Sequence, residues 1–280
     1  MSGVLYLVPT PIGNLGDISR RQAEILAEVD FIAAEDTRVS LKLLNHLDIR
    51  KPLVSYHRHN TETAGPAVLG RILNGETCAL VTDAGTPAVS DPGEELVALC
   101  AAQGVDVISI PGPCAAITAL AVSGLPTGRF TFEGFLPVNK KNRRAHLDSL
   151  RAEERTMIFY EAPHKLRDTL DDLTKTFGGE RRIALCRELT KLHEEIIRTT
   201  LSGAVELYAE KEPKGEYVLV LEGAAPETPE EITPETALAR VEQLRSEGLS
   251  LKAAAKQAAE ELELPKNKLY DLALGKDVVW

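Results

Sequence analysis

The chain has 280 residues, which exceeds one typical domain and predicts two domains with room for an appendage. Its formal net charge of −10 argues against broad, nonspecific binding of nucleic acid. The four cysteines lack the paired spacing of a metal site, and three of them sit in apolar runs, as reduced core thiols do. The N-terminus carries neither a basic leader nor a long apolar span, so we expect a cytoplasmic protein without a membrane span. From the cysteine spacing we expect no bound metal.

Strand-like apolar runs alternate with amphipathic segments in the first part of the chain. Strands are predicted at 4–8, 31–34, 53–56, 79–82 and 105–110. Helices are predicted between them, and in the second helix Leu41, Leu44 and Leu47 are spaced for one apolar face. This alternation is typical of a mostly parallel sheet wrapped by helices, which we assign to a first α/β domain spanning 1–115.

The pattern changes after residue 115. A small-residue helix is predicted at 116–122, followed by strand-like runs at 130–132 with Phe135, and at 156–160, 183–186, 195–199 and 217–221. Strands clustered near the end of this region predict a mixed or antiparallel sheet with helices alongside, in a second α/β domain spanning 116–225. A Pro- and Glu-rich linker at 222–234 indicates the boundary that follows.

The last region, 226–280, contains three short helical patterns, at about 235–247, 250–262 and 266–274. The last two resemble a helix-turn-helix with Leu264 and Pro265 at its turn, which would let Lys266, Lys268 and Tyr270 face nucleic acid. A small helical cap that packs or dimerises accounts for the same pattern, so both interpretations stay open.

The stretch 77–93 joins a predicted buried strand to a helix through a loop rich in Gly and Pro. Its glycines let the backbone approach a ligand closely, and Asp83 offers a hydrogen-bond acceptor. Ligands of open α/β sheets bind on loops of this kind, beyond the carboxyl ends of the strands. Comparable loops follow other predicted strands, at 9–14, 111–116, 161–164 and 187–191. Together they are suited to line a cleft between two domains, although any one of them is also explained as an ordinary turn.

Several common catalytic signatures are missing from the sequence. It has no G-x-G-x-x-G after a strand, no Walker A lysine loop, no HExxH, no CxxC and no G-x-S-x-G. Hydride transfer on a dinucleotide motif, P-loop hydrolysis and zinc chemistry therefore lose support.

Seven motifs run in order along most of the chain: PTPIGNLGDIS (9–19), EDTR (35–38), SYHRHN (55–60), DAGTPAVSDPG (83–93), PGPCAAITAL (111–120), YEAPHK (160–165) and RELTKLHEE (187–195). In this order they resemble the ribosomal RNA small subunit methyltransferase I family, the 2′-O-ribose cytidine methyltransferases of the tetrapyrrole-methylase-like superfamily. The resemblance covers residues 4–223, and the helical patterns at 235–274 agree with a C-terminal extension seen in that family.

The resemblance implies two α/β domains of the tetrapyrrole-methylase type with an interdomain cleft, plus a small C-terminal helical domain. It implies a homodimer that binds S-adenosyl-L-methionine in the cleft and methylates a cytidine in the decoding region of 16S rRNA, in the small ribosomal subunit. By the same likeness the cofactor pocket would be lined by Pro11, Asp83, Gly85, Thr86, Pro87, Cys114, Ala115, Tyr160, Glu161, Leu189, Thr190, Lys214 and Gly215. The chain departs from the family at Cys114, where Ser is usual, and at Arg58, where an acidic residue is common.

A ribose hydroxyl is a poor nucleophile and gains from a base that withdraws its proton as the new bond forms. Glu35, Asp36 and Glu188 are carboxylates at strand ends and are candidates for this base. Each is also explained as a helix cap or as an ion-pair partner. The rival bases are His57, His59, His164 and His193.

Contacts with RNA are expected from cations that follow the same loops or form one basic cluster. These residues are Arg38, His57, Arg58, Lys140, Lys141, Arg143, Arg144 and Lys191. A solvated helix start is the alternative for 140–144. Two other functions also stay open: methylation of a tetrapyrrole, and a ribosome-binding factor that has lost catalysis.

Overall fold

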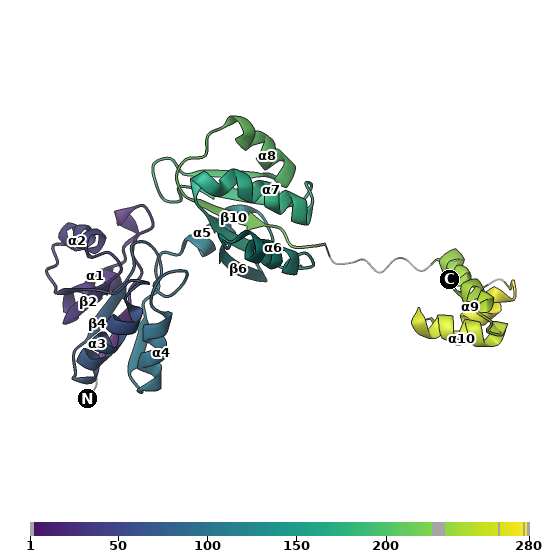
Figure 1. The fold of residues 1–280 in the computed structure, drawn as a ribbon, viewed down its shortest axis with the longest axis horizontal. Coiled ribbons are helices and arrows are strands. Elements are labelled where there is room, and N and C mark those ends of the chain that lie inside the picture. Colours follow the sequence, from purple (N-terminus) through teal and green to yellow (C-terminus); the bar gives the residue numbers. More distant parts are fainter. Residues whose placement is uncertain (1–2, 226–232, 263, 277, 279–280) are drawn as a thin grey trace. The chain divides into compact units, whose positions relative to one another are not determined.

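The computed structural model describes residues 3–225, 233–262, 264–276 and 278. The chain forms two compact units that divide between Ala224 and Ala225 (Figure 1). Among the described residues, no helix has both the length and the apolar character needed to cross a bilayer. All four cysteines are free thiols, and the three predicted in apolar runs, Cys78, Cys100 and Cys186, are buried.

The first unit begins with a fully parallel five-stranded sheet. Its strands are β1 (Val4–Leu7), β2 (Phe31–Ala34), β3 (Leu53–Ser55), β4 (Cys78–Val81) and β5 (Asp106–Ser109), in the order β3-β2-β4-β1-β5. Every residue of β2 and β4 is buried, as expected for central strands of a parallel sheet that is covered on both faces. The predicted parallel sheet is confirmed.

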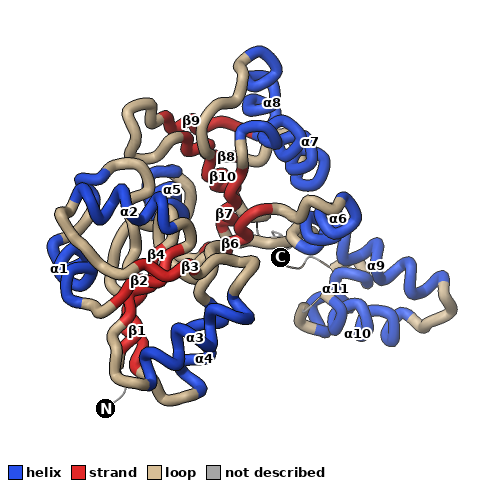
Figure 2. The backbone as a smooth tube through the Cα atoms, turned by 60° about the vertical axis from the view of Figure 1, so that its left-hand side comes forward, coloured by secondary structure: helices blue, strands red, loops and turns tan. Residues whose placement is uncertain are grey.

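Two helices cover each face of this sheet (Figure 2). One face packs against α1 (Arg20–Glu28) and α2 (Thr37–His46), and the other against α3 (Thr61–Leu73) and α4 (Glu94–Ala102). The chain enters α1 through a 3-10 turn, η1 (Leu15–Asp17), and a capping box formed by Ser19 and Gln22.

The predicted apolar face of α2 was wrong in one residue. Leu41 is 49% exposed, whereas Ser40, Leu43 and Leu44 are buried. In a helix of 3.6 residues per turn, positions three apart drift by about 60° at each step, so 41, 44 and 47 spread over roughly 120°. The buried positions follow the i, i+3, i+4 pattern instead, which places Leu41 at the edge of the apolar stripe.

A second, mixed sheet follows in the same unit. Its strands are β6 (Phe130–Phe135), β7 (Thr156–Glu161), β8 (Arg182–Arg187), β9 (Glu195–Thr200) and β10 (Tyr217–Leu221), in the order β6-β7-β10-β8-β9. Only the β6–β7 pair is parallel, and its register shifts between Phe132 and Gly134. This mixed sheet agrees with the prediction from the strand spacing.

Helices also cover both faces of the second sheet. One face packs against α6 (Lys140–Ser149), α7 (Leu166–Phe177) and α8 (Leu201–Glu210), around buried side chains such as Phe159 and Leu219. The other face packs against α5 (Ala115–Ser123), which starts one residue earlier than predicted. A 3-10 turn, η2 (Pro163–Lys165), joins β7 to α7. The contacts of α5 are with the second sheet; the division of this unit at 115/116 stays a prediction.

The second unit is a three-helix cluster formed by α9 (Pro234–Ser246), α10 (Leu251–Glu261) and α11 (Lys266–Ala273). The predicted linker extended too far, because Thr233 caps α9 and Pro234 occupies its first position; residues 226–232 of that linker lie outside the described residues. Leu264 and Pro265 lie between α10 and α11, as predicted. Tyr270 packs against the core of this unit, and Lys266 forms an ion pair with Glu260 at 2.8 Å.

Candidate functional site

The carboxyl ends of the five parallel strands meet at one edge of the first sheet, and their loops are joined there by hydrogen bonds. Thr10, after β1, and Gly85, after β4, exchange two backbone hydrogen bonds of 2.9 Å. The hydroxyl of Thr10 also donates to the carbonyl oxygen of Thr82 at 3.0 Å. These bonds hold the β1 and β4 loops in one fixed arrangement.

The loop between β8 and β9 of the second sheet packs against the β1 loop. A Cβ atom on Gly13 would lie 2.4 Å from Cγ of Lys191, 2.9 Å from Oγ1 of Thr190 and 3.0 Å from the carbonyl oxygen of Leu189. Only glycine fits this approach without a shift of one loop. The two loops predicted to share a cleft therefore lie in contact.

A cavity of about 420 Å³ opens where these loops converge, which is within the range of small-ligand sites. Loops of the first sheet contribute Ile12, Gly85 and Asp91, and strands and loops of the second contribute Tyr160 and Leu189. Cys114 and Ala115, at the start of α5, also line the cavity. There the Tyr160 hydroxyl accepts a hydrogen bond from the Ala116 N–H at 3.2 Å. We call this cavity the central pocket.

The predicted cofactor residues divide into two groups by their place around the central pocket. Those that line it are Gly85, Thr86, Cys114, Ala115, Tyr160, Glu161 and Leu189. Those outside the lining are Pro11, Asp83, Pro87, Thr190, Lys214 and Gly215.

Residues of the second group lie in the same loops as pocket residues but outside the lining of the pocket. Lys214 is exposed and pairs with Glu212 at 3.3 Å, and Gly215 adopts a φ of 79° beside the side chain of Glu188. The hydroxyl of Thr190 is buried and has no hydrogen-bond partner among the described residues. It lies where the β8–β9 loop packs against Gly13.

The structure separates the three candidate bases. Asp36 caps α2 and binds Arg38 at 2.6 Å, and these hydrogen bonds lower its pKa to about 2. Burial raises the pKa of Glu188, but hydrogen bonds from Lys191 (2.9 Å) and from the Glu216 N–H (3.0 Å) outweigh burial and lower it overall. Both side chains therefore behave as the structural alternatives considered from the sequence.

Glu35 differs from the other two. It is half-buried, and its pKa is raised, first by burial and then by the negative charge of Asp83, against a hydrogen bond from the Asp83 N–H. Among the described residues that line the central pocket, the four candidate histidines are absent.

Asp91 lines the central pocket and was not predicted as a site residue. Burial raises its pKa to about 6, with further increases from Glu35 and Asp83 and an opposing effect of Arg58. Arg58 also fixes the loop, since its guanidinium donates to the Ser90 carbonyl oxygen at 3.3 Å. Asp91 is thus a carboxylate whose charge is unfavourable in the folded protein, and such groups concentrate at functional sites. The signal available in the sequence was its place in the DAGTPAVSDPG loop.

Other unpredicted residues complete the apolar and polar walls of the central pocket. They are Ile12, Ala84, Val89, Ser90, Phe135, Ala162, Pro163, Cys186, Glu216, Tyr217 and Val218. Several of them come from β6, β8 and β10, and the apolar runs of these strands do not indicate which face meets a ligand.

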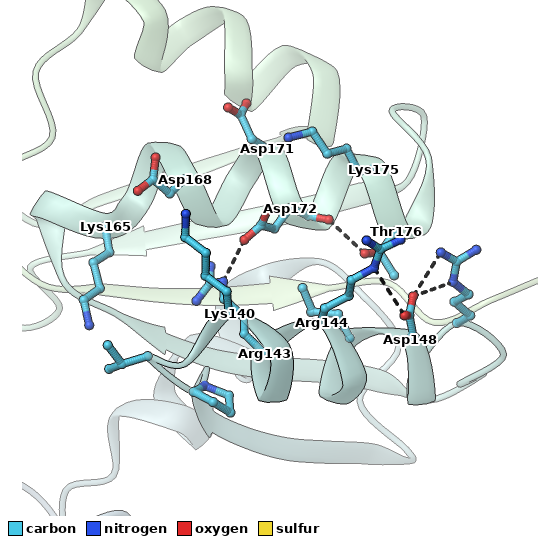
Figure 3. A pocket seen from close by; sticks show the side chains of 14 residues that line it. Lys140, Arg143, Arg144, Asp148, Lys165, Asp168, Asp171, Asp172, Lys175 and Thr176 are labelled. Atoms are coloured by element: carbon cyan, nitrogen blue, oxygen red, sulfur yellow. Dashed lines mark hydrogen bonds and ion pairs between the residues drawn. The ribbon is translucent and has the colours of Figure 1, made fainter.

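The predicted RNA-binding cations lie at several places in the first unit. Lys140, Arg143 and Arg144 line a groove of about 640 Å³ between α6 and α7, opposite Asp168 and Asp171 (Figure 3). Lys141, on the same helix, is exposed. Arg38, His57 and Arg58 follow β2 and β3, and Lys191 lines the central pocket and pairs with Glu188 and Glu216.

Known proteins resemble the chain over nearly its whole length. A family model described as Tetrapyrrole (Corrin/Porphyrin) Methylases matches residues 4–205, and one described as RsmI C-terminal HTH domain matches residues 230–277. A Synechocystis sp. protein named Ribosomal RNA small subunit methyltransferase I is 49% identical over 97% of this chain and 98% of its own length. A protein of the same name from Escherichia coli O157:H7 is 47% identical over 97% of this chain and 95% of its own length. The chain belongs to the ribosomal RNA small subunit methyltransferase I family.

Two solved structures share the fold of this family member. Uroporphyrin-III C-methyltransferase from Thermus thermophilus, complexed with S-adenyl homocysteine, aligns with a TM-score of 0.55 at 18% identity and covers 79% of this chain and 97% of its own. Diphthine synthase aligns with a TM-score of 0.59 at 16% identity, and the alignment covers 79% of this chain and 90% of the diphthine synthase chain. The family resemblance and the fold class predicted from the sequence are confirmed.

Proposed function

We propose that this protein is an S-adenosyl-L-methionine-dependent methyltransferase that methylates the ribose 2′-hydroxyl of a cytidine in the decoding region of 16S rRNA. The observation that carries the proposal is the central pocket, in which Gly85 from the first sheet and Tyr160 and Leu189 from the second line one cavity. Relatives named for methylation of small-subunit ribosomal RNA, at 47–49% identity, support the class of substrate. We propose that it acts in the cytoplasm as a homodimer, on the small ribosomal subunit.

The side chains of the central pocket suit the chemical groups of S-adenosyl-L-methionine. The N-cap residue Cys114 makes no side-chain hydrogen bond to α5, and the Tyr160 hydroxyl accepts from the Ala116 N–H, so the other N–H groups of the first turn and the helix dipole favour the carboxylate of the cofactor. Burial raises the pKa of Tyr160 to about 12, so its hydroxyl keeps a proton to donate. Apolar side chains such as Ile12, Val89 and Leu189 suit the adenine ring. When bound, the cofactor supplies a sulfonium methyl group that is already activated for transfer.

The protein's own contribution is then to align the ribose hydroxyl, exclude water and accept a proton. We assign the proton acceptor to Asp91, because it lines the central pocket and its raised pKa leaves it basic near neutral pH. Glu35 contributes by placing a second negative charge near Asp91. This assignment replaces Asp36 and Glu188, whose charges are already stabilised by Arg38 and Lys191.

The close approach at Gly13 gives a test of the cofactor site. Gly13→Ala should weaken binding of S-adenosylhomocysteine by roughly tenfold, because the added Cβ displaces the Leu189–Lys191 segment at the wall of the pocket. Isothermal titration calorimetry measures this change. Gly70→Ala is the matched control, since a Cβ at Gly70 would meet nothing within 4 Å. Equal affinities for the two variants would contradict this role for the Gly13 contact.

RNA binding should depend on the exposed cations of α6. Charge reversal of Lys141 and Arg144 together should weaken RNA binding by about tenfold at 0.1 M salt and leave affinity for S-adenosylhomocysteine unchanged, because neither side chain lines the central pocket. Filter binding to a decoding-region fragment measures the first quantity and calorimetry the second. Lys42→Glu with Arg50→Glu, two exposed cations elsewhere, is the control. A parallel loss of cofactor binding would contradict this division of roles.

Mapping of ribose methylation tests the reaction directly. We expect cells that lack the protein to lose 2′-O-methylation at a decoding-region cytidine, and expect purified protein with labelled cofactor to restore it on small subunits. Transfer of label to a tetrapyrrole instead of RNA would favour the second candidate activity. Binding to the subunit without transfer of label would favour a non-catalytic ribosome-binding factor.

A further inference from the structure

Arg143 lies inside the basic cluster of α6 but is oriented differently from its neighbour. Its side chain is 13% exposed, compared with 84% for Arg144. Its Nε donates to Oδ2 of Asp172 at 2.7 Å (Figure 3). Its Nη2 donates to Oγ1 of Thr169 at 2.7 Å. The guanidinium of Arg143 therefore binds α7, whereas the guanidinium of Arg144 lies at the surface, where it pairs with Asp148 at 3.8 Å.

The Thr169 hydroxyl links Arg143 to Glu161 through two hydrogen bonds whose direction is fixed. The residue is fully buried, and its hydroxyl also donates to Oε2 of Glu161. A guanidinium has donors and no acceptor, so the Thr169 oxygen must accept from Arg143 and its single proton must point to Glu161. The order of the hydrogen bonds is therefore fixed: Arg143 to Thr169 to Glu161.

Glu161 is the last residue of this series of hydrogen bonds and lies at the wall of the central pocket. It is 4% exposed, and its Oε1 accepts a hydrogen bond from the Ala162 N–H at 2.9 Å. A buried carboxylate needs hydrogen bonds from its surroundings, and it retains lone pairs for further donors. Since Glu161 lines the pocket, a ligand amine or hydroxyl is suited to use the remaining sites.

We propose that Arg143 and Thr169 are positioning residues for the cofactor pocket, and that they orient Glu161 to accept hydrogen bonds from the bound cofactor. This inference rests on the proposed function. It also assigns different roles to two adjacent arginines. Arg143 supports the pocket wall through Thr169 and Glu161, whereas the exposed Arg144 contacts RNA. Both residues were assigned to RNA contact from the sequence.

Substitution of Thr169 gives the sharpest test. Thr169→Val keeps the shape but removes the hydroxyl, so we expect the full-length protein to bind S-adenosylhomocysteine at least about tenfold more weakly. Thr169→Ser keeps the hydroxyl and should bind within about twofold of the unmodified protein. Calorimetric affinity for the Val variant equal to that of the unmodified protein would overturn the inference.

The adjacent arginines form a matched pair for the second test. Arg143→Met should weaken binding of S-adenosylhomocysteine by several-fold to about tenfold, and Arg144→Met should leave it within about twofold. This pair also keeps the inference testable if Thr169→Val does not fold. A purely structural role predicts a lower unfolding midpoint for Arg143→Met with unchanged affinity of the folded protein, and that result would overturn the inference. Failure of the unmodified protein to bind S-adenosylhomocysteine would instead overturn the proposed cofactor itself.

Discussion

Replacement of Asp91 by asparagine should lower kcat by about 10²–10³-fold, because an amide of the same shape cannot accept the proton of the ribose hydroxyl. Affinity for S-adenosylhomocysteine should stay within about twofold, since the wall of the central pocket keeps its shape. Single-turnover methyl transfer to small subunits measures the first quantity, and calorimetry measures the second. Asp106→Asn, at an exposed position on β5, is the matched control.

The pH dependence of the same reaction distinguishes a proton acceptor from a binding residue. Activity should fall as the pH drops through about 6, because protonated Asp91 cannot act as a base. Glu35→Gln removes a negative neighbour that raises the pKa of Asp91, so this limb of the profile should move to lower pH. A profile of the Glu35→Gln variant that superimposes on that of the unmodified protein would contradict the coupling.

Stability gives an independent check that Asp91→Asn is folded. The pKa of Asp91 is higher in the folded protein than in an unfolded chain, so its contribution to stability is present at low pH and is lost as the pH rises through about 6. At pH 7 the ionised carboxylate therefore destabilises the fold. We expect the asparagine variant to unfold at the same temperature as the unmodified protein or higher. A clear decrease in its unfolding midpoint would contradict this account of the raised pKa.

Strand positions in both sheets follow from local sequence. Phe31–Ala34 was predicted with its observed bounds, because a short run of apolar residues between polar segments forms a buried central strand. Ser19 and Asn139 are the N-caps of α1 and α6, and residues of these types favour that position. These features depend on neighbours within a few residues, so a single sequence is sufficient to predict them.

The chemistry of the central pocket depends on tertiary convergence and is harder to predict. The pKa of Asp91 is raised first by burial and then by Glu35 from the β2 loop and Asp83 from the β4 loop, against the opposing effect of Arg58 from the β3 loop. No local pattern indicates that arrangement. The different exposure of Arg143 and Arg144 does have a local signal in the sequence. Arg143 is four residues before the buried Leu147, so the two side chains share one face of the helix.

The second sheet should be sensitive to loss of Phe159. Its side chain is fully buried in the core between the sheet and helices α6 to α8, so Phe159→Ala should reduce the free energy of unfolding by about 3–5 kcal/mol. The loss combines the transfer of the removed ring with the cavity that remains, which close packing around β7 prevents from collapsing. Urea denaturation followed by circular dichroism measures this change, provided that unfolding of the first unit is resolved from that of the three-helix unit.

Phe130→Ala removes the same side chain from a different environment and is the matched control. Phe130 lies on the edge strand β6 and is 38% exposed, so its loss should reduce the free energy of unfolding by no more than about 1.5 kcal/mol. The difference between the two variants isolates the contribution of burial, because the chemical change is identical. If Phe130→Ala were as destabilising as Phe159→Ala, the loss in the free energy of unfolding would depend on the residue type and not on burial in the core. If neither variant were destabilising, the packing of helices α6 to α8 on this sheet would not support the fold.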